Sequence, residues 1–172
     1  QSGWLTNRGV LVQELEQRLA SYFGVKNVIA VANGSLALQV CYKALGLTGK
    51  VLTTPFSFAA TASTLRWEGT TPVFVDICPK TFNMCISKAS ELELKEASGI
   101  VPVHVFGNPC NVELIEDMSR RYNLKVVYDA AHAFGVNYKG SSVFGYGDAS
   151  TVSFHATKLF HCVEGGAIFT ND

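Results

Sequence analysis

Short apolar runs alternate with longer segments of helical periodicity along this chain, and that alternation limits the possible folds more than any other feature. Strand-like runs occupy residues 27–32, 51–54, 72–75, 100–105, 124–128, 149–154 and 166–169. Segments with helical spacing occupy residues 10–23, 35–45, 57–67, 88–97 and 112–122. Strands that alternate with helices predict an α/β fold with a mostly parallel sheet and helices on both faces.

Capping residues set the expected ends of these helices. Gly24 and Gly46 each follow a helical segment, as expected where a chain leaves a helix. Ser57 and Asn111 are predicted to act as N-caps of the segments that begin beside them. The last two strand-like runs are expected to pair through the loop that joins them.

Composition excludes several classes of function. The 172 residues suffice for one domain, and 48% of them are apolar. Lys plus Arg and Asp plus Glu number 14 each, which gives no support for a nucleic-acid partner or a membrane surface. No apolar run has membrane-spanning length. The five cysteines form no CxxC pair, so we expect reduced thiols in a cytoplasmic protein. No histidine or cysteine pair has the usual zinc-ligand spacing, so no metal site is predicted.

Polar residues follow several of the strand-like runs. In parallel sheets ligands bind beyond the carboxyl ends of the strands. The residues expected at that edge are Asn33, residues 55–57, Asp76, residues 104–107 and Asp129. Asn33, Gly34 and Ser35 open a helix, whose free N–H groups and partial positive charge attract phosphate. The same three residues also suit an ordinary turn and cap.

Asp129 and Lys158 supply a carboxylate and an amine. At a strand end, Asp129 fits a metal ligand, a ribose partner, a cofactor partner or a plain helix cap. Lys158 fits either a desolvated nucleophile or an exposed loop lysine. Glu164, Gly165 and Gly166 follow it, and the glycines permit a tight backbone near a ligand. An amine, a strand-end carboxylate and a phosphate-binding helix start are together the three anchors that pyridoxal phosphate needs.

Two further side chains are weaker candidates. Phe58 lies near a helix start, where its ring is able to stack on a flat heterocycle or to join the core. Ser153 fits a phosphate ligand or an ordinary strand serine. A generic dinucleotide-binding domain is disfavoured, because the turn after the first strand lacks G-x-G-x-x-G.

Taken in order, these segments resemble the DegT/DnrJ/EryC1/StrS family of sugar-nucleotide aminotransferases, which depend on pyridoxal phosphate (PLP). The resemblance covers nearly the whole chain and is carried by residues 3–9, 14–16, 33–38, 55–61, 129–135, 153–158 and 164–166. It implies the large domain of the aspartate aminotransferase-like fold (fold type I) over residues 1–172. Family members are about twice as long, so a smaller C-terminal domain is expected to be absent from this chain.

The resemblance also implies roles for individual residues. Lys158 is expected to form the Schiff base and move protons, and Asp129 to pair with the pyridine nitrogen. The phosphate is expected to lie on Gly34, Ser35 and Ser153. Phe58 is expected to stack on the ring, and His132 to lie near the phenolic oxygen.

The implied reaction transfers an amino group from glutamate to a keto-sugar carried on a nucleoside diphosphate, such as dTDP-4-keto-6-deoxyglucose. Residues 155–158 resemble the subgroup that acts at C4 of the sugar. One dehydratase branch has histidine in place of the lysine, so Lys158 favours transamination. A homodimer with a shared active site is also implied. The alternatives are a truncated, non-catalytic paralogue that binds PLP or a partner chain, and a regulatory protein that uses this domain to dimerise.

Overall fold

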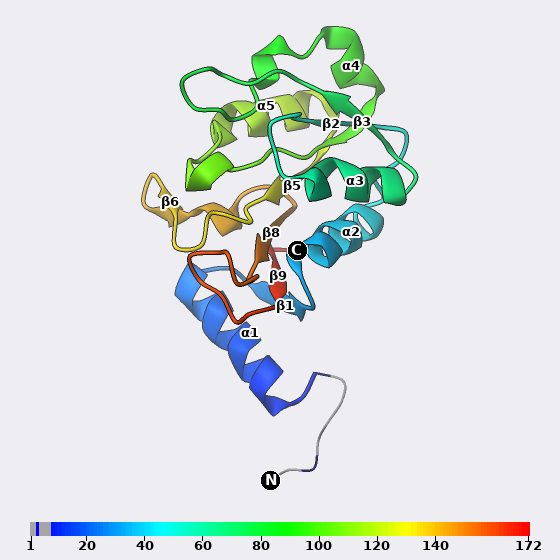
Figure 1. Cartoon of the computed structure of the whole chain (residues 1–172). Helices are drawn as coiled ribbons and strands as arrows, with labels where there is room; N and C mark the ends of the chain where they lie inside the picture. Colours follow the sequence, from blue (N-terminus) through cyan, green and yellow to red (C-terminus); the bar gives the residue numbers. More distant parts are fainter. Residues whose placement is uncertain (1–2, 4–7) are drawn as a thin grey trace.

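A seven-stranded sheet forms the centre of the molecule, in the strand order β1-β9-β8-β5-β4-β2-β3 (Figure 1). The computed structural model describes residue 3 and residues 8–172, so most of the segment 3–9 that opens the resemblance lies outside the described residues. The strands of the sheet are β1 (Asn27–Val31), β2 (Lys50–Thr53), β3 (Thr71–Phe74), β4 (Ala97–Ile100), β5 (Lys125–Asp129), β8 (Ala149–Ser153) and β9 (Gly166–Thr170).

Strand β9 is antiparallel to both of its neighbours, β1 and β8, whereas the remaining neighbouring pairs are parallel. The expected pairing of the last two strands through their connecting loop is therefore confirmed. Gly166 pairs with Val31 on one side and with Ser153 on the other. The first residue of β9 thus lies at the edge where β1 and β8 end.

Helices cover both faces of the sheet, as the alternation predicts. They are α1 (Val10–Phe23), α2 (Gly34–Ala44), α3 (Ala59–Trp67), α4 (Glu91–Glu96) and α5 (Val112–Tyr122). Successive side chains of a strand point to opposite faces, and β5 shows which helices lie on each side. Val127 packs in one cluster with Leu38 of α2, whereas Val126 and Tyr128 pack in another with Ile115 of α5.

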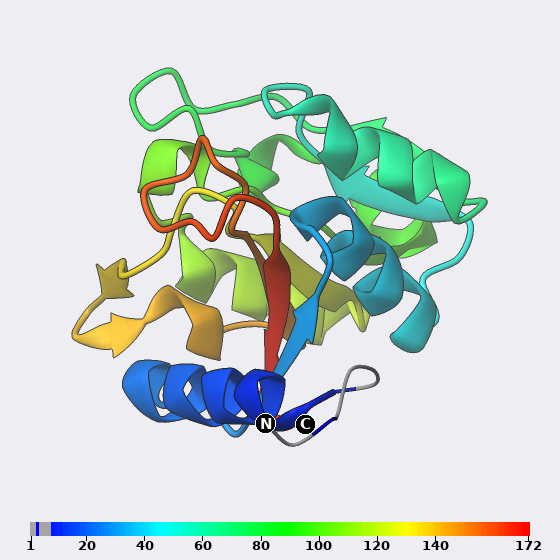
Figure 2. The same cartoon turned by 60° about the horizontal axis from the view of Figure 1, so that its bottom comes forward.

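A third cluster lies beneath the antiparallel part of the sheet. Phe23 of α1 packs there with Val28 of β1 and Phe169 of β9. Phe144, from the short 3-10 helix η3 (Val143–Gly145), stacks on Phe169 with ring centroids 4.1 Å apart. Figure 2 shows α1 running along this end of the sheet, on the opposite side of β1 and β9 from α2.

The structure corrects several local predictions. The strand expected at residues 100–105 is instead β4, which ends at Ile100. Pro102 has no N–H to donate to a ladder, and beyond it only Val103 forms an isolated bridge, to Asp129. A 3-10 helix, η2 (Val105–Gly107), follows. The hairpin of β6 (Asn137–Tyr138) and β7 (Ser141–Ser142) was not predicted.

Two predicted helix starts also differ. Ser57 is not the N-cap of α3, because Phe58 occupies that position and the Ser57 hydroxyl bonds Thr61 instead. The helix expected at residues 88–97 divides into η1 (Ile86–Lys88) and α4. Ser90 begins α4 with a capping box, in which its side chain bonds the N–H of Glu93 and the Glu93 carboxylate bonds back.

Candidate active site

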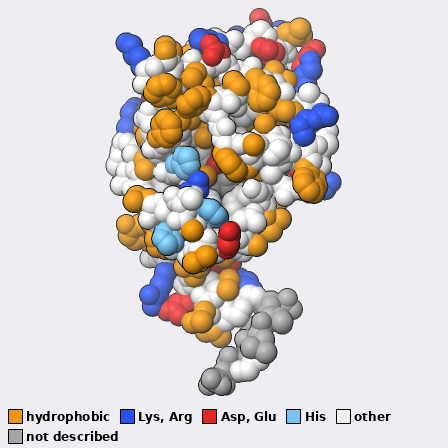
Figure 3. All heavy atoms as spheres, viewed as in Figure 1, with side chains coloured by type: hydrophobic (Ala, Val, Ile, Leu, Met, Phe, Trp, Pro, Cys, Tyr) orange, Lys and Arg blue, Asp and Glu red, His pale blue; other side chains and the backbone are white. Residues whose placement is uncertain are grey.

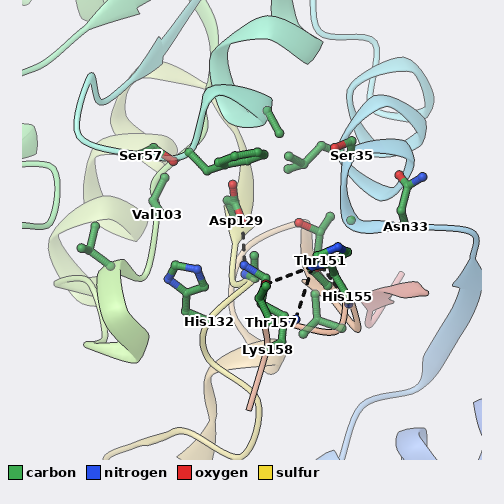
Figure 4. A pocket seen from close by; sticks show the side chains of 18 of the residues that line it. Asn33, Ser35, Ser57, Val103, Asp129, His132, Thr151, His155, Thr157 and Lys158 are labelled. Atoms are coloured by element: carbon green, nitrogen blue, oxygen red, sulfur yellow. Dashed lines mark hydrogen bonds between the residues drawn. The ribbon is translucent and has the colours of Figure 1, made fainter. Parts of the chain in front are cut away.

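A cavity of about 720 Å³ opens at the carboxyl ends of β1, β5 and β8 (Figure 4). All the residues predicted for the site line it: Gly34, Ser35, Phe58, Asp129, His132, Ser153 and Lys158. In the space-filling view, histidine side chains and a Lys or Arg side chain gather near the middle of one face, with apolar side chains beside them (Figure 3). Residues that are far apart in the sequence therefore meet in one cavity.

Asp129 ends β5 with its carboxylate buried at the floor of this cavity. The residue is 5% exposed. The hydroxyl of Thr61 donates to Oδ2 at 2.7 Å, and the N–H of Ala131 donates to Oδ1 at 3.2 Å. Among the described residues, no basic side chain forms an ion pair with this carboxylate. A buried carboxylate without a cationic partner is costly, so the site favours a ligand with a positive N–H.

The start of α2 forms a second wall. Asn33 caps the helix, because its Oδ1 accepts the N–H of Leu36 at 2.8 Å and its carbonyl accepts that of Ala37. The N–H groups of Gly34 and Ser35 precede these bonds and lie at the positive end of the helix dipole. Both residues line the cavity, as does Ser153. The arrangement is suited to an anion such as phosphate.

Glycines allow this wall to close tightly. A Cβ on Gly34 would lie 2.9 Å from the Cβ of Ser153. A Cβ on Gly166 would lie 2.6 Å from the carbonyl carbon of Asn33 and 2.8 Å from the nitrogen of Gly34. The glycine expected to permit a tight backbone near a ligand therefore allows β9 to pass directly against the β1–α2 turn.

Lys158 lies in the loop between β8 and β9, half-buried and facing the same cavity as Asp129. Backbone bonds from Ala156 to Val163 and from Lys158 to His155 shape this loop. Its far side is held by Phe160, whose ring stacks on that of Phe134 with centroids 4.2 Å apart. Lys158 thus lies on a loop that the stacking of Phe160 on Phe134 holds in place.

His132 and Phe58 complete the set of predicted residues. Burial and the charge of Lys158 lower the pKa of His132, and Asp129 acts in the opposite direction. The lowered pKa favours the neutral imidazole, which is able to donate one hydrogen bond. Phe58 is the N-cap of α3 and is 77% exposed, so its side chain is accessible to a flat ligand.

Not every residue expected at this edge lines the cavity, and one residue of the site was not predicted. Asp76 does not line the cavity but pairs with Lys88 at 2.6 Å on the surface. His104 is buried against Tyr128, with its Nδ1 accepting the N–H of Cys110. Thr61, which holds Asp129, was not predicted. Only its spacing of four residues from Ser57 hinted at a shared helix face. No group of three or more metal-ligating side chains occurs within residues 3 and 8–172.

Comparison with known families agrees with this geometry. The model of the DegT/DnrJ/EryC1/StrS aminotransferase family matches residues 1–172. The chain belongs to that family. The resemblance and the fold expected from it are confirmed. No helix in the described part of the chain is long and apolar enough to cross a membrane.

The chain is similar to named proteins and solved structures of this family. A dTDP-4-amino-4,6-dideoxy-D-glucose transaminase of Shigella dysenteriae is 48% identical over 171 residues, which are 99% of this chain and 47% of the relative. DesI, solved in the presence of its TDP-sugar product, superposes with a TM-score of 0.93 at 40% identity and covers 99% of this chain and 44% of DesI. The PLP form of the putative sugar aminotransferase Spr1654 from Streptococcus pneumoniae gives 0.89 at 27% identity, over all of this chain and 48% of Spr1654. The chain therefore spans about half the length of the relatives it matches.

Proposed function

We propose that this chain is the cofactor-binding part of a PLP-dependent aminotransferase that acts on a sugar nucleotide. One observation carries the proposal: Lys158, Asp129 and the start of α2 line the same cavity. An amine, a buried carboxylate that has no cationic partner within the described residues, and the N–H groups at a helix start are the complement of an aldehyde, a pyridine nitrogen and a phosphate. The residues present thus fit pyridoxal phosphate.

The resemblance implies a role for each residue, and its place in the cavity is consistent with that role. PLP supplies an aldehyde for condensation with amines and an electron sink for the carbanion that follows. Lys158 would hold the cofactor through Nζ and later take the proton from the amino carbon of the substrate. Asp129 would keep the ring nitrogen protonated, because opposite charges favour the charged form. The neutral His132 would donate a hydrogen bond to the phenolic oxygen, and Phe58 would cover the ring and exclude water.

The amino donor and acceptor are proposed from the relatives. We take glutamate as the donor and a keto-sugar on a nucleoside diphosphate as the acceptor. The transaminase of Shigella dysenteriae and the TDP-sugar product bound to DesI support a dTDP-linked substrate. A cytoplasmic location is proposed with them, because free nucleotide sugars are made and used there.

The first test is an absorbance spectrum of the full-length protein with pyridoxal phosphate, before and after glutamate. We expect a visible band that depends on Lys158 and shifts to shorter wavelength with glutamate. Lys158→Ala should remove the band, whereas Lys125→Ala, a surface lysine paired with Asp148, should leave it unchanged. A band of equal strength in Lys158→Ala would show that Lys158 is not the anchor.

We also propose that a second copy of the chain completes the site. Several apolar side chains in or beside the cavity are exposed: Phe58 and Phe106 line it, and Leu159, which follows Lys158 in the chain, is 91% exposed. Such a concentration of apolar surface is typical of an interface. Sedimentation velocity should show a dimer that Leu159→Glu weakens. A monomer at all concentrations would contradict this proposal and leave the cofactor proposal intact.

A further inference from the structure

A chain of hydroxyl groups leads from the cavity wall to the buried carboxylate. The hydroxyl of Thr61 donates to Oδ2 of Asp129 at 2.7 Å. Ser57 Oγ lies 2.6 Å from Thr61 Oγ1. Thr61 has one hydroxyl hydrogen, and Asp129 takes it, so Ser57 must be the donor in the second bond. Both hydroxyls therefore point their hydrogens toward the carboxylate, an arrangement in which each bond strengthens the next.

Two donors fix the plane of the Asp129 carboxylate. Thr61 holds Oδ2 from helix α3, and Ala131 holds Oδ1 at 3.2 Å from the loop after β5. Because these donors come from different elements, rotation about the side-chain bond would break at least one of them. The lone pairs that remain free are thus held in one direction, toward the cavity that Asp129 lines.

The first turn of α3 joins this carboxylate to the predicted ring-stacking side chain. Thr61 is fully buried, and its N–H donates to the carbonyl of Phe58 at 3.2 Å. The hydroxyl of Tyr42, also fully buried, reaches the carbonyl of Thr61 at 3.4 Å. Burial and backbone hydrogen bonds therefore fix the position of Thr61, and Phe58 lies in the same helical turn.

We propose that Thr61 is a positioning residue, supported by Ser57, that aims the Asp129 carboxylate at the ring nitrogen of the cofactor. This inference rests on the proposed function and names a residue beyond those that would touch pyridoxal phosphate. The hydroxyl of Thr61 stabilises the negative charge on Oδ2 and prevents the carboxylate from turning away. Without it, the carboxylate pairs less well with the ring, and the ring nitrogen loses its proton more easily.

Three variants of the full-length protein separate this role from packing. Thr61→Val keeps the volume and removes the hydroxyl, whereas Thr61→Ser keeps the hydroxyl and removes the methyl group. Thr64→Val is the matched control on the same helix. Thr64 is also buried, but its hydroxyl reaches backbone carbonyls, that of Ala60 at 2.6 Å and that of Thr61 at 3.4 Å, and does not bond Asp129.

Two measurements do not require turnover. The first is the dissociation constant of pyridoxal phosphate. The second is the pH at which its ring nitrogen loses a proton, followed by NMR with ¹⁵N-labelled cofactor. A hydrogen bond to a charged group suggests that Thr61→Val weakens binding roughly tenfold to a hundredfold. We also expect the ring nitrogen of the cofactor bound to Thr61→Val to lose its proton at lower pH than in wild type. Thr61→Ser and Thr64→Val should stay within about threefold of wild type.

The possible outcomes lead to different conclusions. If Thr61→Val matches Thr61→Ser in both measurements, the positioning role is refuted and the cofactor site stands. If wild type itself shows no Lys158-dependent binding, the proposed function fails and this inference fails with it. If Thr61→Val does not fold, Ser57→Ala replaces it. If the ring nitrogen of the cofactor bound to Ser57→Ala loses its proton at lower pH than in wild type, the inference is supported. If it loses the proton at the same pH, the inference is refuted.

Discussion

Replacement of Gly166 by alanine should disturb the turn between β1 and α2, where we propose that the cofactor phosphate binds, without changing any other side chain of the site. The new Cβ would lie 2.6 and 2.7 Å from the carbonyl carbon and oxygen of Asn33 and 2.8 Å from the nitrogen of Gly34, where ordinary contact begins at 3.4 Å. These are backbone atoms, so the turn must move by more than half an ångström. Overpacking of this kind costs about 1–3 kcal/mol. For a domain of this size that lowers Tm by roughly 3–10 °C.

The displaced turn carries the N–H groups of Gly34 and Ser35, so the affinity for pyridoxal phosphate should fall by about tenfold or more. Thermal unfolding and cofactor titration measure the two effects on one sample. Gly145→Ala is the control, because its Cβ meets no atom within 4 Å and its φ is not positive. If Gly166→Ala has the same Tm and the same affinity for pyridoxal phosphate as Gly145→Ala, the close approach of β9 to the turn does not shape the site.

Three further predictions concern other parts of the molecule. Burial lowers the pKa of His104 from 6.5 to about 4, so the unfolded chain takes up a proton first as pH falls. The free energy of unfolding therefore has its full value, as far as His104 is concerned, above pH 6.5. It falls by up to about 3 kcal/mol as the pH is lowered toward 4. His104→Gln should flatten that decline in urea unfolding between pH 7.5 and 4.5, and an equal slope in both proteins would contradict the burial argument. Phe160→Ala removes the stacking on Phe134 and should cost about 2 kcal/mol, less than a fully buried phenylalanine because the ring is partly exposed. Limited proteolysis should then cut the Lys158 loop faster, whereas Phe160→Leu should be intermediate. Glu16→Ala leaves the N–H of Ala30 without its 3.0 Å acceptor and removes the partner of Arg8, at a cost of about 1–3 kcal/mol. Glu16→Gln should recover most of that loss in urea unfolding, and no recovery would assign the effect to the charge alone.

Local signals in the sequence predict those parts of the fold that local interactions determine. Helix α5 begins and ends where its apolar spacing and Asn111 place it, and Asn111 Oδ1 accepts the N–H of Leu114. The prediction of a strand at residues 100–105 was wrong, because apolar character alone does not show where pairing with the neighbouring strand ends. Pro102 interrupts the ladder there. The hairpin of β6 and β7 was missed because each of its strands has only two residues.

In the site, too, the sequence predicts what its own segments carry and misses what depends on contacts between distant segments. Lys158, Asp129 and Gly34 belong to segments whose order resembles a known family, so the sequence predicts that they lie together. Thr61 was missed because its bond to Asp129 joins positions 68 residues apart and depends on how the fold brings the start of α3 to the end of β5. Such a contact has no local pattern, and only the assembled fold reveals it.

The direction of β9, which is opposite to that of the other strands of the seven-stranded sheet, explains how the amine lies at the same edge as the other groups. Strands β1, β5 and β8 run in one direction, so Asn33, Asp129 and Ser153 come at the same edge of the sheet. Because β9 runs the opposite way, it begins at that edge, and the loop from β8 to β9 never leaves it. A parallel β9 would require a crossover to the far edge before the strand began. The reversal therefore keeps Lys158 at the same edge of the sheet as Asp129, and Gly166 allows the returning strand to fit against the turn between β1 and α2.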